Sequence, residues 1–207
     1  MIPAVESKPM EVLFEFPSRV QDLYHHCLEL DHWFVKYFGK WPFDASVLKN
    51  KQIPHSHRPQ GSKPCRGFNE FYMATQYIEA GYEVLLYYRS PKENHDTKSY
   101  DIAKRLLKGD LGGIIHIGPP GESPDMLVFR GNQFRFVECK AKDEDYTSTQ
   151  LPNFRRIDQI LNSGDYGEPL SDPARTDLFP ESTKPDHLRW IHAVRLVEKH
   201  LESHGKI

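Results

Sequence analysis

The residues best suited to chemistry are two carboxylates and a lysine that lie close together in the sequence: Asp125, Glu138 and Lys140. Strand alternation puts Glu138 and Lys140 on the same face of an extended segment. If Asp125 lies opposite Glu138 in a hairpin, their Cβ atoms are roughly 5 Å apart, and the two like charges repel one another. Such oxygen ligands suit Mg²⁺ or Mn²⁺. Lys140 would then orient a water or neutralise a developing phosphate charge.

The surrounding sequence predicts that hairpin. The runs 125–130 and 133–141 are rich in apolar, aromatic and β-branched residues, and the Gly-Asn pair between them is typical of a two-residue hairpin loop. Pairing the residues that flank this loop brings Asp125 opposite Glu138, and alternation points Cys139 to the other face. A simpler interpretation keeps the hairpin but makes Lys140 an ordinary ion-pair partner of one carboxylate, with no metal.

Two short motifs carry a resemblance to a known family. The Pro-Asp pair at 124–125 and the Glu-Cys-Lys triplet at 138–140 resemble the signature of the PD-(D/E)xK nucleases, and most closely the virus-type replication-repair nuclease (VRR-NUC) domain. Glu70, at the start of a predicted helix, matches the family's accessory glutamate. Gln150, which opens the helix after the ECK strand, matches its glutamine. The resemblance covers about 68–161.

The resemblance implies a fold and a set of roles. The fold would be α/β, with a restriction-endonuclease-like core of a mixed sheet flanked by helices in αβββα order, and with N-terminal and C-terminal helical extensions. The activity would be divalent-metal-dependent hydrolysis of phosphodiester bonds, in DNA rather than RNA, including branched or flapped replication and repair intermediates. The implied catalytic residues are Asp125, Glu138, Lys140 and Gln150, and the implied Mg²⁺ or Mn²⁺ ligands are Glu70, Asp125, Glu138 and the backbone carbonyl of Cys139.

The sequence suggests three regions. Residues 1–60 are expected to form an N-terminal helical extension and basic linker, 61–165 the nuclease core, and 166–207 a loop and a C-terminal helix packed on the core. The apolar residues Trp190 and Val194, continued at intervals of three or four, favour that last helix, at about 185–203.

The predicted sheet lacks a clear last strand. After the helix that Gln150 opens, only the pair at 178–179 has strand character, so the sheet is completed by this pair, by the run 112–118 or by the N-terminal run 12–16. Earlier in the chain, the patterns predict a helix from Asn69 to about Gly81, a strand at 82–88 and a basic helix at 99–108.

Phosphate contacts would have to come from local basic patches, because the net charge is −2. From 45 to 69 the chain carries no acidic residue, and the predicted helix at 99–108 adds a second basic group. These segments are either phosphate-contacting surfaces or solvated ones. The candidate nucleic-acid-binding residues are Lys49, Lys51, Arg58, Lys63, Arg66, Lys104 and Arg105.

Composition narrows the setting. The 207 residues are 38% hydrophobic and 27% charged, as expected of a globular protein with a sizeable core. Three unpatterned cysteines indicate no disulfide framework or zinc site, which suits a reducing compartment. No signal peptide and no apolar run of membrane-spanning length is recognisable. We therefore expect a cytoplasmic (intracellular) protein with no membrane partner.

Three functions remain open at this point. A nuclease requires the full set of Asp125, Glu138 and Lys140, whereas a non-cleaving nucleic-acid-binding module with the same fold does not. A structural or interaction protein would carry the three residues as a surface ion network. Since one chain carries one site, a symmetric homodimer is the simplest arrangement for cutting both strands of a duplex.

Overall fold

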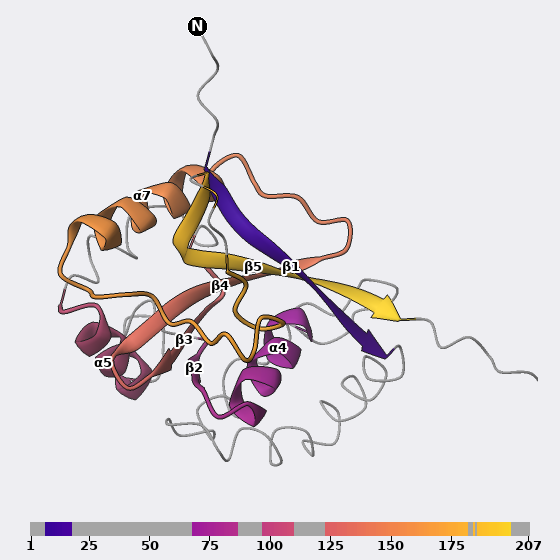
Figure 1. The fold of residues 1–207 in the computed structure, drawn as a ribbon, viewed down its shortest axis with the longest axis horizontal. Helices are drawn as coiled ribbons and strands as arrows, with labels where there is room; N and C mark the ends of the chain where they lie inside the picture. The colour runs from indigo at the N-terminus through magenta and orange to yellow at the C-terminus, as the bar shows by residue number, and fades with distance from the viewer. Residues whose placement is uncertain are drawn as a thin grey trace, which may run out of the picture.

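The computed structural model describes residues 7–17, 68–86, 97–109, 123–181, 184 and 186–199. These residues form an α/β fold with a five-stranded mixed sheet in the order β1-β5-β4-β3-β2, flanked by helices (Figure 1). In chain order the elements are β1 (Lys8–Pro17), α4 (Phe68–Glu79), β2 (Glu83–Leu85), α5 (Thr97–Leu106), β3 (Met126–Arg130), β4 (Gln133–Ala141), α7 (Gln150–Ser163) and β5 (His187–Lys199).

The hairpin forms in the predicted register. β3 and β4 are antiparallel, Arg130 pairs with Gln133, and Met126 pairs with Val137. The loop residue Gly131 has a φ of 62°, a conformation that glycine adopts without steric cost. Because the pairing runs without interruption, the next step along the two strands brings the residue before Met126 to the level of Glu138.

The predicted C-terminal helix is wrong: this segment is β5, a strand in the interior of the sheet. It pairs in parallel with β4 on one side and with β1 on the other. Residues 190–194 are all buried, because a strand between two parallel neighbours is covered on both faces. Burial on both faces removes the alternation by which a strand is recognised, and the spacing of Trp190 and Val194 then fits a helical stripe equally well.

The N-terminal run 12–16 does belong to the sheet, as part of the edge strand β1. The pair at 178–179 lies in a turn, and the run 112–118 lies outside the described residues. Both β1 and β5 come from outside the segment 61–165 that we expected to form the nuclease core, and the run 12–16 was one of the three candidates to complete the sheet. The sheet therefore draws on all three predicted regions of the chain.

The helices agree better with the sequence. α4, α5 and α7 correspond to the three helices expected before and after the hairpin, although α4 begins at Phe68, so Asn69 lies inside the helix rather than at its cap. Omitting α5, the order from α4 to α7 is helix, three strands and helix, as expected. α4 and α7 lie on opposite sides of the sheet (Figure 1).

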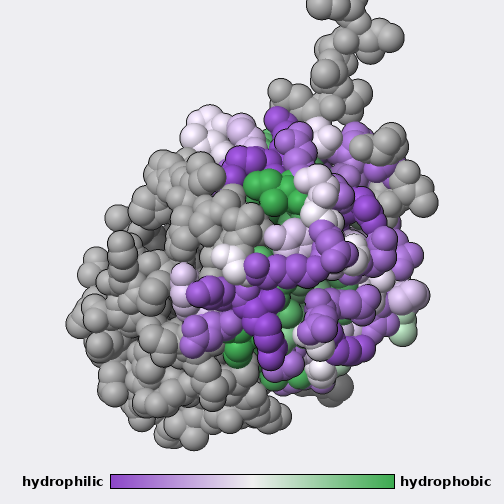
Figure 2. Space-filling model, turned by 90° about the vertical axis from the view of Figure 1, so that its left-hand side faces the viewer, coloured by the Kyte–Doolittle hydropathy of each residue, from purple (hydrophilic) through white to green (hydrophobic). Residues whose placement is uncertain are grey.

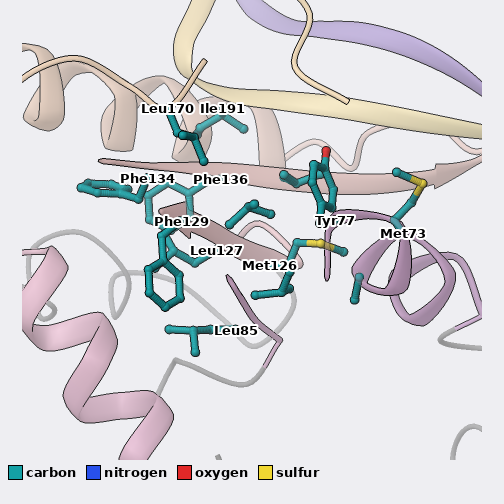
Figure 3. Packing of buried hydrophobic residues seen from close by; sticks show 14 of the residues in the cluster. Met73, Tyr77, Leu85, Met126, Leu127, Phe129, Phe134, Phe136, Leu170 and Ile191 are labelled. Carbon is teal, nitrogen blue, oxygen red and sulfur yellow. The ribbon is translucent and has the colours of Figure 1, made fainter. Parts of the chain in front are cut away.

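The core lies on both sides of the hairpin strands. Buried side chains of α4, including Met73 and Tyr77, approach the sheet from one side, and Figure 3 shows them next to residues of the hairpin. Phe134 and Phe136 make an edge-to-face ring contact at 6.0 Å between centroids. This packing holds β4 rigidly in the middle of the sheet.

On one face of the molecule, the described part of the surface is largely hydrophilic (Figure 2). Figure 2, which views the left-hand side of Figure 1, shows hydrophilic residues around small apolar areas. Within the described residues, no helix has both the length and the apolar character required to cross a bilayer.

Candidate active site

Lys140 is the centre of the candidate site. Its side chain is only 2% exposed, and so is that of Glu138, whose Oε1 lies 3.0 Å from Lys140 Nζ. Burial by itself would lower the pKa of Lys140, but the charge of Glu138 and its hydrogen bond outweigh burial and raise this pKa. Lys140 therefore stays protonated, as a cation held inside the protein by a carboxylate on the same face of β4.

Gln150 joins these two residues into a triangle. Its Nε2 donates to Glu138 Oε1 at 2.9 Å, and its Oε1 accepts from Lys140 Nζ at 3.0 Å. Gln150 is therefore a buried residue of α7 that contacts the end of the hairpin.

The start of α7 fixes the orientation of Gln150. Thr147 Oγ1 accepts from the backbone N–H of Gln150 at 3.2 Å, and Gln150 Oε1 accepts from the backbone N–H of Thr147 at 3.0 Å. This reciprocal pair is a capping box, which satisfies two N–H groups at the start of the helix. The amide of Gln150 is thus held from both ends, by its own helix and by β4.

Asp125 is held at the same level of the hairpin. Its Oδ2 accepts from the backbone N–H of Cys139 at 2.8 Å, so the side chain continues the hydrogen-bonding pattern just beyond the last paired residue of β3. The structure therefore brings Asp125 beside the Glu138-Cys139-Lys140 triplet, as the predicted register required.

Glu70, in the first turn of α4, belongs electrostatically to this group. Burial and then the negative charge of Asp125 raise the pKa of Glu70 from 4.5 to about 8, while Lys140 lowers it. Glu70 therefore lies close enough to Asp125 for the two carboxylates to repel one another. The negative charge of Glu144 also raises the pKa of Glu70. Together with Glu138, these residues place four carboxyl groups near Lys140.

Cys139 contributes no thiolate. Its side chain is buried, and burial followed by the charges of Asp125 and Glu70 raises the pKa of its thiol well above the ordinary value. A neutral thiol is a poor metal ligand and a poor nucleophile. The backbone carbonyl remains the group through which Cys139 would contribute an oxygen ligand.

Two residues that the sequence analysis missed complete the surroundings of Lys140. Glu144 Oε1 lies 3.5 Å from Lys140 Nζ, and its Oε2 accepts from the backbone N–H of Ala141 at 3.1 Å. The ring of Tyr146 lies below the ammonium, 5.1 Å from Nζ to the ring centroid. In the sequence, the only sign of this ion pair was that Glu144 follows Lys140 by four residues. That spacing brings the two side chains together only because the chain turns back after β4.

Arg195 on β5 holds the chain segment 141–144, at the end of β4, in place. Its Nε and Nη2 bind both oxygens of Glu11 at 3.0 and 3.1 Å, and its Nη1 donates to three backbone carbonyls between 141 and 144. A planar guanidinium suits such a bidentate contact. No local pattern predicts this contact, because it joins β1, β5 and the segment after β4.

The donor set fits a divalent cation in its chemistry. Glu70, Asp125 and Glu138 offer the carboxylate oxygens that Mg²⁺ and Mn²⁺ prefer, and a cation would relieve the repulsion that raises the pKa of Glu70. Within the part of the chain that the structure describes, no three His, Cys, Asp or Glu side chains already converge as a metal-binding group. Glu138 Oε1 is instead engaged by Lys140 and Gln150.

The candidate nucleic-acid-binding residues are only partly described. Lys104 and Arg105 are exposed in the last turn of α5, where we expected a basic helix surface. The remaining five, Lys49, Lys51, Arg58, Lys63 and Arg66, lie outside the described residues, as does the acid-free segment that carries them.

In comparisons with known proteins, no family model, no curated protein and no solved structure matches this chain. The functional argument therefore depends on the geometry of the site and on the motifs that it contains.

Proposed function

We propose that this protein is a divalent-metal-dependent nuclease whose active site is formed by Asp125, Glu138, Lys140 and Gln150. The observation that carries this proposal is the buried triangle of Lys140, Glu138 and Gln150 beside Asp125. A surface ion network would not require burial of a lysine and a glutamate to 2% exposure, which costs desolvation energy without necessarily stabilising the fold. Perturbed groups of this kind gather preferentially at functional sites.

Each residue has a role that follows from its surroundings. Lys140 stays protonated, so it acts as a hydrogen-bond donor and a positive charge next to the scissile phosphate, and not as a base. Gln150 holds Glu138 and Lys140 in a fixed relation. Glu70, Asp125, Glu138 and the carbonyl of Cys139 would hold Mg²⁺ or Mn²⁺, which when bound supplies Lewis-acid activation of water and of the phosphate.

The substrate class follows from the resemblance of the Pro-Asp and Glu-Cys-Lys motifs to the PD-(D/E)xK nucleases, and to the VRR-NUC domain in particular. We infer DNA as the substrate, with branched or flapped intermediates of replication and repair as the preferred forms. The order of elements from α4 to α7, with a helix before and a helix after three strands once α5 is set aside, is compatible with a restriction-endonuclease-like core. A symmetric dimer would supply the second site needed to cut both strands of a duplex.

The test is a cleavage assay on a labelled panel of single-stranded, duplex, flapped and four-way-junction DNA and of RNA, with Mg²⁺, Mn²⁺ or EDTA. Glu138→Gln is the informative variant, because glutamine keeps an oxygen acceptor for Lys140 while removing the charge. Glu83→Gln, at an exposed position of β2, is the matched control.

We expect metal-dependent cleavage that Glu138→Gln reduces roughly a thousandfold and Glu83→Gln leaves unchanged. The preferred member of the panel identifies the substrate class. Metal-dependent binding of DNA without cleavage would replace the nuclease by a non-cleaving binding module of the same fold. If the chain neither cleaves nor binds nucleic acid, the proposal is wrong.

A further inference from the structure

A second polar region lies at the opposite end of the same strand. A cavity of about 670 Å³ lies where the parallel strands β1, β5 and β4 begin, bordered also by α7, by the segment 168–181 and by Lys184. Arg135, near the start of β4, lines it. Lys140 lies five positions after Arg135, which is about 16 Å along a strand. The cavity is therefore a separate region from the candidate active site.

Arg135 is a buried cation with few partners. Its residue is 9% exposed, and its Nη1 donates to the carbonyl oxygen of Pro180 at 3.2 Å. Its Nε has no hydrogen-bond partner among the described residues. A guanidinium has five N–H donors, and a buried charge is ordinarily paired with an opposite charge. In the described part of the chain, Arg135 has no carboxylate within ion-pair distance.

The nearest imidazole does not add to the positive charge. His192 lines the same cavity, and burial followed by the charge of Arg135 lowers its pKa well below the ordinary value. Its Nε2 lies within hydrogen-bond distance, 2.9 Å, of the hydroxyl of Tyr77, and this hydroxyl lies 2.9 Å from the carbonyl oxygen of Leu178. Because its pKa is lowered, His192 is neutral, and of these two residues only Arg135 supplies positive charge.

The carboxylates that line the cavity are engaged elsewhere or exposed. Asp158 accepts from the backbone N–H of Trp190 and from Asn162 Nδ2, both at 2.7 Å. Glu168 is paired with Arg189 on the surface. Glu181 is exposed, although its charge still acts on Arg135. None of these three carboxylates forms an ion pair with the guanidinium of Arg135.

We propose that this cavity binds a small organic acid, with its carboxylate on the guanidinium of Arg135. A planar carboxylate matches the fork of a guanidinium, with two parallel hydrogen bonds. A carboxylate brings a single negative charge, whereas a doubly charged phosphate would bring more negative charge into a lining that already holds three carboxylates beside Arg135, Lys184 and Arg189. Met10, Pro169 and Leu188 give the cavity apolar walls for the body of the acid, and its volume is typical of small-molecule sites. This proposal does not depend on the nuclease.

The experiment is calorimetric titration of the intact chain with benzoate, with its neutral analogue benzamide, with acetate and with inorganic phosphate. We expect saturable binding of benzoate, at least tenfold weaker binding of benzamide and acetate, and weaker binding of phosphate. Arg135→Met should weaken benzoate binding at least tenfold. Arg189→Met, which removes a surface cation of the same cavity, should change it less than twofold.

Arg135→Lys keeps the charge but removes the fork, and should bind benzoate at an intermediate level, which keeps the proposal testable if Arg135→Met fails to fold. Glu138→Gln should bind benzoate as the wild type does, since the two sites are separate. Absence of saturable benzoate binding, equal binding of benzamide, or unchanged binding in both Arg135 variants would overturn the proposal. Tighter binding of phosphate than of benzoate would overturn the choice of a carboxylate ligand.

Discussion

The strand β4 carries two buried cations, Lys140 and Arg135, whose side-chain donors have very different partners. Lys140 lies within 3.0 Å of both a carboxylate and an amide oxygen, and a second carboxylate lies at 3.5 Å. Arg135, on the opposite face of the same strand, donates to one backbone carbonyl. The difference shows that Lys140 belongs to an arrangement completed by the protein itself, whereas Arg135 retains donors that the described residues do not use.

This contrast assigns different functions to the two ends of the strand. Lys140, Glu138 and Gln150 are already held in fixed positions by one another, and groups fixed in this way can stabilise a transition state without moving. Arg135 lines a cavity, and its Nε has no hydrogen-bond partner among the described residues, which is what a site must provide if a ligand is to complete its hydrogen bonding. The predictions below test this contrast, from the largest expected effect to the smallest.

Removing the partner of Lys140 should have the largest effect on stability. Glu138→Ala leaves a buried ammonium without its closest charge, and we expect a loss of about 3–5 kcal/mol in the free energy of unfolding, measured by urea denaturation. This differs from what the sequence suggests, namely relief of repulsion between Glu138 and Asp125. The double variant Glu138→Ala/Lys140→Met should recover most of the loss.

Glu144→Ala is the control for this experiment, because Glu144 is half-exposed and should contribute at most about 1 kcal/mol. A loss of less than about 1 kcal/mol in Glu138→Ala would show that Lys140 is not buried as described.

The pH dependence of stability should reveal the carboxylate group around Lys140. The pKa of Glu70 is about 8 in the folded state against 4.5 for an ordinary glutamate, so the folded state binds more protons between these values. Stability from Glu70 is therefore fully present below about pH 4.5 and is lost as the pH rises through about 8. Glu70→Gln should stabilise the metal-free protein by about 2 kcal/mol at pH 9, less than the whole shift implies because solvent screens a partly exposed group.

The measurement is thermal or urea unfolding at several pH values, with EDTA present. Glu79→Gln, at an exposed position of the same helix, should leave the pH profile unchanged. Equal pH profiles for the wild type and Glu70→Gln would contradict the raised pKa of Glu70 in the folded protein.

Removing Arg135, the other buried cation of β4, should have the smallest effect on the free energy of unfolding. Arg135→Met loses one hydrogen bond to Pro180 but also removes a buried charge that no carboxylate of the described residues pairs, so the two effects nearly cancel. We expect the free energy of unfolding to change by no more than about 1 kcal/mol. A loss of 3 kcal/mol or more would mean that Arg135 is paired as tightly as Lys140, and the contrast between the two cations would disappear.

The sequence predicted the hairpin and its register because both follow from local features. A two-residue loop with glycine determines which residues pair, and alternation then determines which side chains share a face. The meeting of Asp125, Glu138 and Lys140 followed from these two rules. The place of Gln150 at the start of the next helix was also predictable, because helix starts carry recognisable capping residues.

The sequence could not predict features that depend on distant parts of the chain. β5 lost the pattern of a strand because it is buried on both faces. Arg195 contacts carbonyls more than fifty residues away, so nothing near it indicates its role. The difference in partners between Arg135 and Lys140 also depends on which residues pack against each face of β4. In the sequence, both are simply basic residues of one strand.

The central claim is that the arrangement around Lys140 is a metal-dependent phosphodiesterase site. Its most direct test is the rate of DNA cleavage with Mg²⁺ or Mn²⁺ for the wild type beside Asp125→Asn, which keeps an acceptor for the N–H of Cys139 but removes the charge. Asp172→Asn, which changes a carboxylate that likewise accepts a backbone N–H far from the site, is the matched control. We predict cleavage that requires the metal, falls roughly a thousandfold in Asp125→Asn and persists in Asp172→Asn. Equal rates in the wild type and Asp125→Asn would contradict the account.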